Sequence, residues 1–115
     1  MERDPRDKWS IAAIKYANHT AGMHFFERAT MRFFDSRVLR HVYQGPGGIY
    51  FITSEQFHGS DGRSEPRKYT VREFNPITGD CFTAGDYHHF GTLSKEQARH
   101  DARVMARTAK IVAVV

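Results

Sequence analysis

The sequence has a single cysteine and no long hydrophobic run. Cys81 is the only cysteine among 115 residues, so neither an internal disulfide nor a multi-cysteine metal framework can form. The N-terminal "MERDPRDKWS" mixes charges of both signs and is not followed by the apolar stretch that a signal peptide or a membrane span requires. We therefore expect a soluble protein of the reducing cytoplasm that has no membrane partner.

Length and charge limit the organisation further. A chain of 115 residues can bury one core of ordinary size, which predicts a single domain over residues 1–115. Lysine and arginine number 17 against 13 acidic residues, a net charge of +4, which is enough to attract polyanions. Within the domain we expect a flexible N-terminus (1–9), a mobile loop (55–67) and an apolar tail (111–115, "IVAVV").

The first half of the chain predicts a helix followed by a β-hairpin. Ser10 can cap a helix that ends at Gly22, and its apolar side suits packing on a sheet. The phenylalanine doublets in 24–38 indicate a short helix or turn. In 39–53, "LRHVY" and "IYFIT" flank the turn sequence "QGPGG", a pattern typical of a hairpin.

The second half predicts two more strands and a final helix. "KYTVREF" (68–74) alternates between two faces, and a shorter strand begins at Cys81. Ser94 can cap a helix that runs to about Lys110, and Gln97 lies at the capping-box position. The predicted fold is α+β, an antiparallel sheet of three to five strands with an N-terminal helix and a C-terminal basic amphipathic helix packed on it.

The last helix carries the clearest candidate for a binding surface. Its predicted packing side consists of alanines and a methionine: Ala98, Ala102, Met105 and Ala109. A neighbouring stripe is basic, because it consists of Lys95, Arg99, Arg103, Arg107 and Lys110. Cations at intervals of four can follow a phosphate backbone. Glu96 lies near Arg99, however, and basic residues late in a helix favour its dipole, so a solvated, stabilising stripe is the alternative.

Catalytic and metal chemistry have weak support in the sequence. Cys81 with Asp86, His88 and His89 matches no zinc-ligand spacing, and the adjacent histidines would point to opposite faces of a strand. Cys81 has no evident base or oxyanion hole, and "GPGG" lacks the lysine of a phosphate-binding loop. We expect no catalytic residues, no metal and no cofactor, and therefore not an enzyme.

At "HFFERATMRFFDSRV", "YFITSEQF" and "YTVREFNPITGD" the sequence resembles a group of short proteins encoded by bacteriophages, prophages and other mobile elements. The resemblance runs from about Ala13 to Ala106. It implies a bacterial host cytoplasm and a protein that acts by binding DNA or by binding a host defence protein or enzyme, as anti-CRISPR and antirestriction proteins do.

The β-β-β-α half is similar in layout to the AP2-like DNA-binding modules of phage integrases. That similarity implies a sheet face in the major groove, reached through Lys68, Thr70 and Arg72 or through Tyr69 on the opposite face. A double-stranded-RNA-binding domain is also α-β-β-β-α and has a basic "SKK" where this chain has "SKE" at Ser94 to Glu96.

These patterns favour a binding protein whose partner is nucleic acid, with DNA preferred. The predicted site lies on the basic helix and the adjoining sheet and consists of Lys95, Arg99, Arg103, Arg107, Arg67, Lys68 and Arg72. The alternative is a protein-protein inhibitor of a bacterial defence system that uses a protruding loop or an aromatic patch. We expect a monomer or a homodimer.

Overall fold

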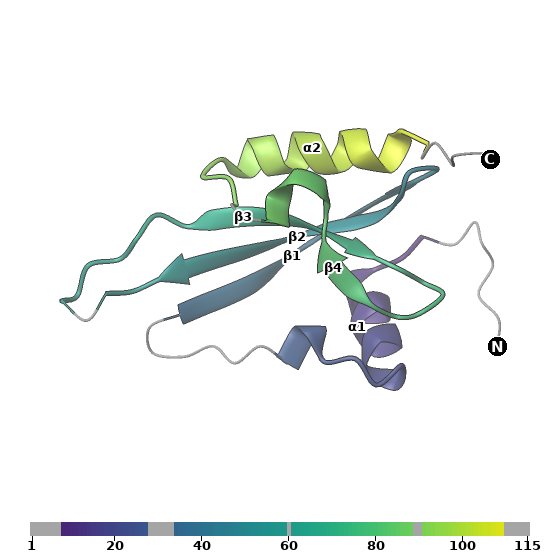
Figure 1. Ribbon diagram of the computed structural model, residues 1–115, viewed down its shortest axis with the longest axis horizontal. Coiled ribbons are helices and arrows are strands. Elements are labelled where there is room, and N and C mark those ends of the chain that lie inside the picture. The colour runs from purple at the N-terminus through teal and green to yellow at the C-terminus, as the bar shows by residue number, and fades with distance from the viewer. Residues whose placement is uncertain (1–7, 28–33, 60, 89–90, 110–115) are drawn as a thin grey trace.

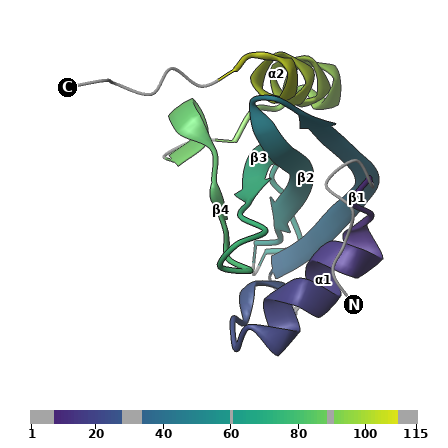
Figure 2. The same ribbon diagram turned by 90° about the vertical axis from the view of Figure 1, so that its right-hand side faces the viewer.

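The structure, a computed structural model, describes residues 8–27, 34–59, 61–88 and 91–109. The elements in chain order are α1 (Ile11–Thr20), the short 3₁₀ helix η1 (Phe25–Glu27), β1 (Phe34–Gly45), β2 (Gly48–Phe57), β3 (Lys68–Phe74), β4 (Cys81–Thr83), the short 3₁₀ helix η2 (Gly85–His88) and α2 (Lys95–Arg107). The strands form one sheet between two helical layers, with α2 on one face and α1 on the other (Figure 1, Figure 2). The predicted α+β fold is confirmed.

The sheet is fully antiparallel and its strands follow chain order, β1-β2-β3-β4. β1 and β2 form the predicted hairpin, in which Gly45 opposes Gly48 across the turn. Gly48 has a φ of +128°, a conformation that glycine adopts without a steric cost. Because β1 pairs with β2 alone, it forms one outer edge of the sheet along its whole length. A register shift between Val38 and Val42 interrupts its pairing with β2.

α2 packs on one face through a stripe of small residues. Ala98, Ala102 and Ala106 are buried against Tyr50, Val71 and other core residues of the sheet. Small side chains let the helix approach closely, and the backbone N–H of Gly47 in the hairpin turn donates to the carbonyl of Ala106 at 2.8 Å. These contacts fix the last turn of α2 against the end of the β1–β2 hairpin.

The opposite face is covered by the N-terminal segment. Ile14 of α1 is fully buried against Phe51, Phe74 and Cys81 of the sheet. The ring of Trp9 packs on that of Phe74, with centroids 4.8 Å apart. Both faces of the sheet are thus occupied over the middle of the molecule.

Several predicted boundaries were wrong. β1 begins at Phe34 and β2 continues to Phe57, because the two strands keep pairing well beyond the segment that is dense in β-branched residues. Residues 55–57 are therefore strand rather than loop. α2 ends at Arg107, so Ala106 takes the packing position predicted for Ala109, which is exposed.

The predicted caps agree with the structure. The Ser10 hydroxyl accepts a hydrogen bond from the backbone N–H of Ala13, and the Ser94 hydroxyl accepts one from Gln97. Most of the predicted flexible N-terminus (1–7) and the apolar tail (111–115) lie outside the described residues. None of the helices in the described ranges is long and apolar enough to cross a membrane.

Candidate functional site

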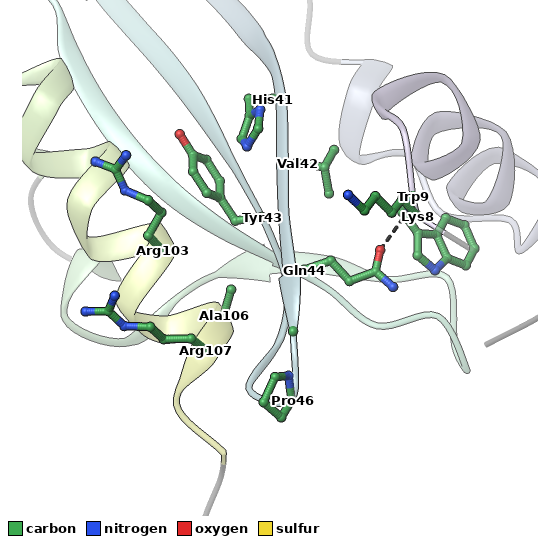
Figure 3. Close-up of a pocket in the computed structure, with 11 residues that line it drawn as sticks. Lys8, Trp9, His41, Val42, Tyr43, Gln44, Pro46, Arg103, Ala106 and Arg107 are labelled. Atoms are coloured by element: carbon green, nitrogen blue, oxygen red, sulfur yellow. Dashed lines mark hydrogen bonds between the residues drawn. The ribbon is translucent and has the colours of Figure 1, made fainter. Parts of the chain in front are cut away.

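A hollow runs between α2 and the outer strand β1. Near the hairpin it has a volume of about 500 Å³, extends over both sides of β1 (Figure 3), and is lined by Lys8, Trp9, six consecutive residues of β1 and its turn (41–46), Arg103, Ala106 and Arg107. Toward the start of α2 a second part of about 240 Å³ is lined by Leu39, Arg40, His41, Tyr43, Ile52, Lys95 and Arg99. Because the two parts share His41 and Tyr43, we treat them as one feature, the α2–β1 groove.

The spacing of the helix determines which side chains reach this groove. The alanine stripe of α2 faces the sheet, and the positions next to it on the β1 side are Lys95, Arg99, Arg103 and Arg107. Residues four apart lie above one another on a helix and rise by ~6 Å per step. The four cations therefore form a row along the groove. The sequence predicted that these residues share one side of the helix, but not that this side borders a groove.

The lining of the α2–β1 groove is strongly positive. Among the described residues that line the two parts of the groove there is no aspartate or glutamate. Arg99 forms an exposed ion pair with Glu96, whose Oε1 lies 3.3 Å from Nη1 of Arg99. Within the described ranges, no carboxylate lies within ion-pair distance of Lys95, Arg103 or Arg107. Clustered cations beside low-dielectric protein raise the local concentration of anions.

Aromatic side chains stand among these cations. The rings of His41 and Tyr43 pack edge to face, with centroids 4.3 Å apart. Tyr43 is buried, whereas His41 is exposed at the junction of the two parts of the groove. Figure 3 shows that Arg103 and Arg107 lie on the α2 side of β1, and that Lys8 and Trp9 lie on its other side. The hairpin end of the groove thus combines cations with flat apolar rings.

Arg67 is not part of the α2–β1 groove. Its guanidinium donates to the Asp35 carboxylate and, at 2.8 Å, to the Ser54 hydroxyl. The hydrogen bond from Arg67 lowers the pKa of Asp35 below its usual value, with a further contribution from Arg37. Arg67 therefore ties β1 to β2 at the end of the sheet remote from the hairpin, which corrects its predicted place on a binding surface.

Arg72 is buried, which corrects its predicted role as well. Only 8% of the residue is exposed. Its guanidinium donates to the hydroxyls of Thr53 and Thr83, and its Nη2 lies 3.2 Å from Oε1 of Glu55. It also lies over the Phe25 ring at 5.5 Å. A charge held in this way cannot contact a polyanion in solution.

The sheet face expected to enter a DNA groove is consequently closed. Lys68 is exposed at the start of β3, but Thr70 and Arg72 beside it are buried. On the opposite face, Tyr69 packs against the core beneath α2. The described structure therefore gives no open sheet face at these positions.

Sequence reasoning missed the contribution of β1 and of the segment before α1. Arg40 and His41 line the groove from β1, and Lys8 and Trp9 reach it from before the first helix. Basic and aromatic residues occur together in "RHVYQ", but only the position of β1 as an outer strand beside α2 shows which of them meet the basic stripe.

The cysteine and histidine candidates yield no reactive site. Burial raises the pKa of the Cys81 thiol to about 12, which keeps it protonated and unreactive at neutral pH. His89 and the side chains of Asp86 and His88 lie outside what the structure describes. No group of three or more potential metal-ligating side chains is found in the described ranges.

The fold and this site define a small α+β domain with a basic, aromatic-lined groove between its C-terminal helix and a sheet edge. Residues 10–101 match DUF7447, which is described as a family of unknown function, and the chain belongs to that family. No curated protein and no solved structure matches the chain. The match extends from the cap of α1 through the first half of α2; it includes Lys95 and Arg99 but not Arg103 and Arg107.

Proposed function

We propose that this protein is a non-enzymatic accessory protein of a phage or other mobile element and that it binds nucleic acid in the α2–β1 groove. The observation that carries the proposal is the row of Lys95, Arg99, Arg103 and Arg107 along a hollow whose described lining residues include no carboxylate. Arg40 adds a cation from the strand side. Each phosphate neutralised by such a row releases condensed counterions, which favours binding.

The alternative interpretation, a solvated stabilising stripe, explains part of the row. The pair between Arg99 and Glu96 has the i, i+3 spacing of ordinary helix stabilisation. It does not explain why the remaining cations face a hollow beside β1 rather than the open side of the helix. A stripe that served only stability would gain from nearby carboxylates, and the described residues of the groove lining include none.

A double charge reversal tests the proposal. Arg99→Glu with Arg103→Glu removes two central cations of the row and places two carboxylates in the groove. We expect nucleic-acid binding, measured by fluorescence anisotropy, to weaken at least 100-fold. Thermal stability should change little, because exposed side chains away from the core contribute within ~0.5 kcal/mol.

The matched control is Lys15→Glu with Arg63→Glu, which changes the net charge equally on exposed residues outside the groove. The control variant should bind within a few-fold of the wild type. Equal loss in both variants would mean that net charge, and not the groove, drives binding. Loss of stability with binding retained in the groove variant would contradict the proposal.

A second candidate function, the inhibition of a host defence protein, is favoured by a different region. Beyond the start of α2, the ends of β1 and β2 opposite to their turn and the β2–β3 connection project from the helical layers (Figure 1). There Phe57 is 54% exposed and packs on Phe34 with centroids 4.8 Å apart. Large aromatic residues at a projecting end suit a protein contact.

A pull-down from nuclease-treated bacterial lysate tests this second function. It should recover one stoichiometric partner, and Phe57→Ser should abolish that recovery. Recovery of many proteins in a nuclease-sensitive set would instead favour nucleic-acid binding.

A further inference from the structure

The hairpin end of the α2–β1 groove extends over both sides of β1 and has aromatic surface on each side (Figure 3). Its volume is about 500 Å³, within the ~300–1,000 Å³ typical of small-molecule pockets. Tyr43 contributes aromatic surface on the α2 side, Trp9 contributes it on the other side, and Pro46 adds a further apolar wall (Figure 3). A nucleobase is a flat aromatic ring of suitable size for such a lining.

Cations accompany this pocket on both sides of the strand. Arg103 and Arg107 lie on the α2 side and Lys8 on the other (Figure 3). His41 is exposed where the pocket continues into the part of the groove lined by Lys95 and Arg99. A chain of phosphates running along the row could therefore place a base against His41 or in the pocket. Aromatic surfaces interleaved with cations are typical of proteins that bind single strands.

The shape of the site argues against a duplex. A helix that reads duplex DNA inserts a protruding face into a major groove ~12 Å wide. The basic side of α2 instead lies beside β1, and its cations line a hollow. In a duplex the base faces are stacked on one another and only their edges are accessible, so the aromatic lining would have no ring to contact.

We infer that the groove binds single-stranded nucleic acid and that its hairpin end accepts unstacked bases beside Trp9 and beside His41, which lie on opposite sides of β1 (Figure 3). This inference rests on the proposed function and specifies its ligand class. The backbone edge of β1 would supply hydrogen-bonding groups along the strand, because an outer strand uses only one of its two edges in the sheet.

The protein carries its own reporter for this site. Trp9 is the only tryptophan in the chain, so intrinsic tryptophan fluorescence reports on the pocket alone. We would titrate the full chain with unlabelled 12-nucleotide single-stranded DNA, single-stranded RNA of the same sequence, and the corresponding DNA duplex. The expected result is at least tenfold tighter binding of a single strand than of the duplex, accompanied by quenching of Trp9 fluorescence.

His41→Ala tests the stacking directly without disturbing the core, because His41 is exposed. It should weaken single-strand binding about tenfold, equivalent to ~1.4 kcal/mol for one stacked base. The matched control is His100→Ala, an exposed histidine of α2 that does not line the groove. That variant should bind as the wild type does.

The outcomes separate the inference from the proposed function. Equal or tighter duplex binding, or single-strand binding without a change in Trp9 fluorescence, would overturn the inference and leave the proposed function standing. Failure of every nucleic acid to bind, even at ~50 mM salt where phosphate contacts are strongest, would overturn both. Comparison of the DNA and RNA titrations then identifies the preferred strand.

Discussion

Two groups of basic side chains in this protein carry the same charge in opposite surroundings. Arg67 and Arg72 on the β3 side of the sheet each hold a carboxylate, Asp35 and Glu55 respectively. The basic residues of α2 line a hollow in which the described lining residues include no carboxylate. In the first group the positive charge joins strands together, whereas in the second it is available to an external anion.

This contrast shows that net charge is a poor guide to a binding surface in a small domain. The chain has an excess of four positive charges, but Arg67 and Arg72 add little to its external field because each is paired with a carboxylate. Neutralisation of Arg72 by Glu55 is local, and both side chains are largely buried. The cations of α2, by contrast, line the α2–β1 groove and are exposed or partly exposed.

The largest expected effect is on the buried arginine. Arg72→Met removes the cation that is paired with the largely buried Glu55 carboxylate, and breaking a buried ion pair typically costs about 3–5 kcal/mol. We expect a loss of about this size in the free energy of unfolding, measured with urea. The same substitution in the other group, Arg103→Met, should change stability by less than ~0.5 kcal/mol.

A second variant isolates the cause of that loss. Arg72→Met combined with Glu55→Gln removes the uncompensated charge and should recover part of the stability. No recovery would mean that the hydrogen bonds from Arg72 to Thr53 and Thr83, rather than the ion pair, stabilise this part of the sheet.

A smaller effect is expected at the partly exposed pair of Asp35 and Arg67. The pKa of Asp35 is lowered from its ordinary value of 3.8, chiefly by the hydrogen bond from Arg67. A carboxylate with a lowered pKa contributes stability above its ordinary pKa and loses that contribution as the pH falls toward the lowered value. The stability difference between wild type and Asp35→Asn, measured by urea unfolding, should therefore shrink from pH 7 to pH 3. A difference that is constant with pH would contradict the pairing.

The sequence was sufficient to predict the fold and the α2 side of the groove. Ser10 and Ser94 were recognised as caps, and the alternation in 68–74 predicted which residues of β3 share a face. The row on α2 followed from helical spacing alone, because cations at i, i+4 must share one side.

The failures have a common physical origin in contacts between distant segments. The sequence predicted Arg72 as a surface cation, because the alternation of residues along β3 is the same whether the sheet face that carries Arg72 is open or covered. It is buried because Phe25, Thr53 and Glu55 surround its guanidinium, and they lie 47, 19 and 17 residues away in the sequence. The other wall of the groove was missed for the same reason, since no local pattern shows that β1 is the outer strand beside α2.

The smallest expected effect on stability is also the most direct test of the available charges. Lys95→Ala and Arg103→Ala each remove one exposed cation from the row, and each should leave the free energy of unfolding within ~0.5 kcal/mol of the wild type. If all four cations of the row contact phosphates of a single strand, log Kd should rise with log salt concentration with a slope of about 2.8, and each variant should lower that slope by about 0.7. Anisotropy titrations between ~50 and ~200 mM salt measure the slope. An unchanged slope in both variants would mean that these cations do not contact the bound strand, whatever the affinity of the wild type.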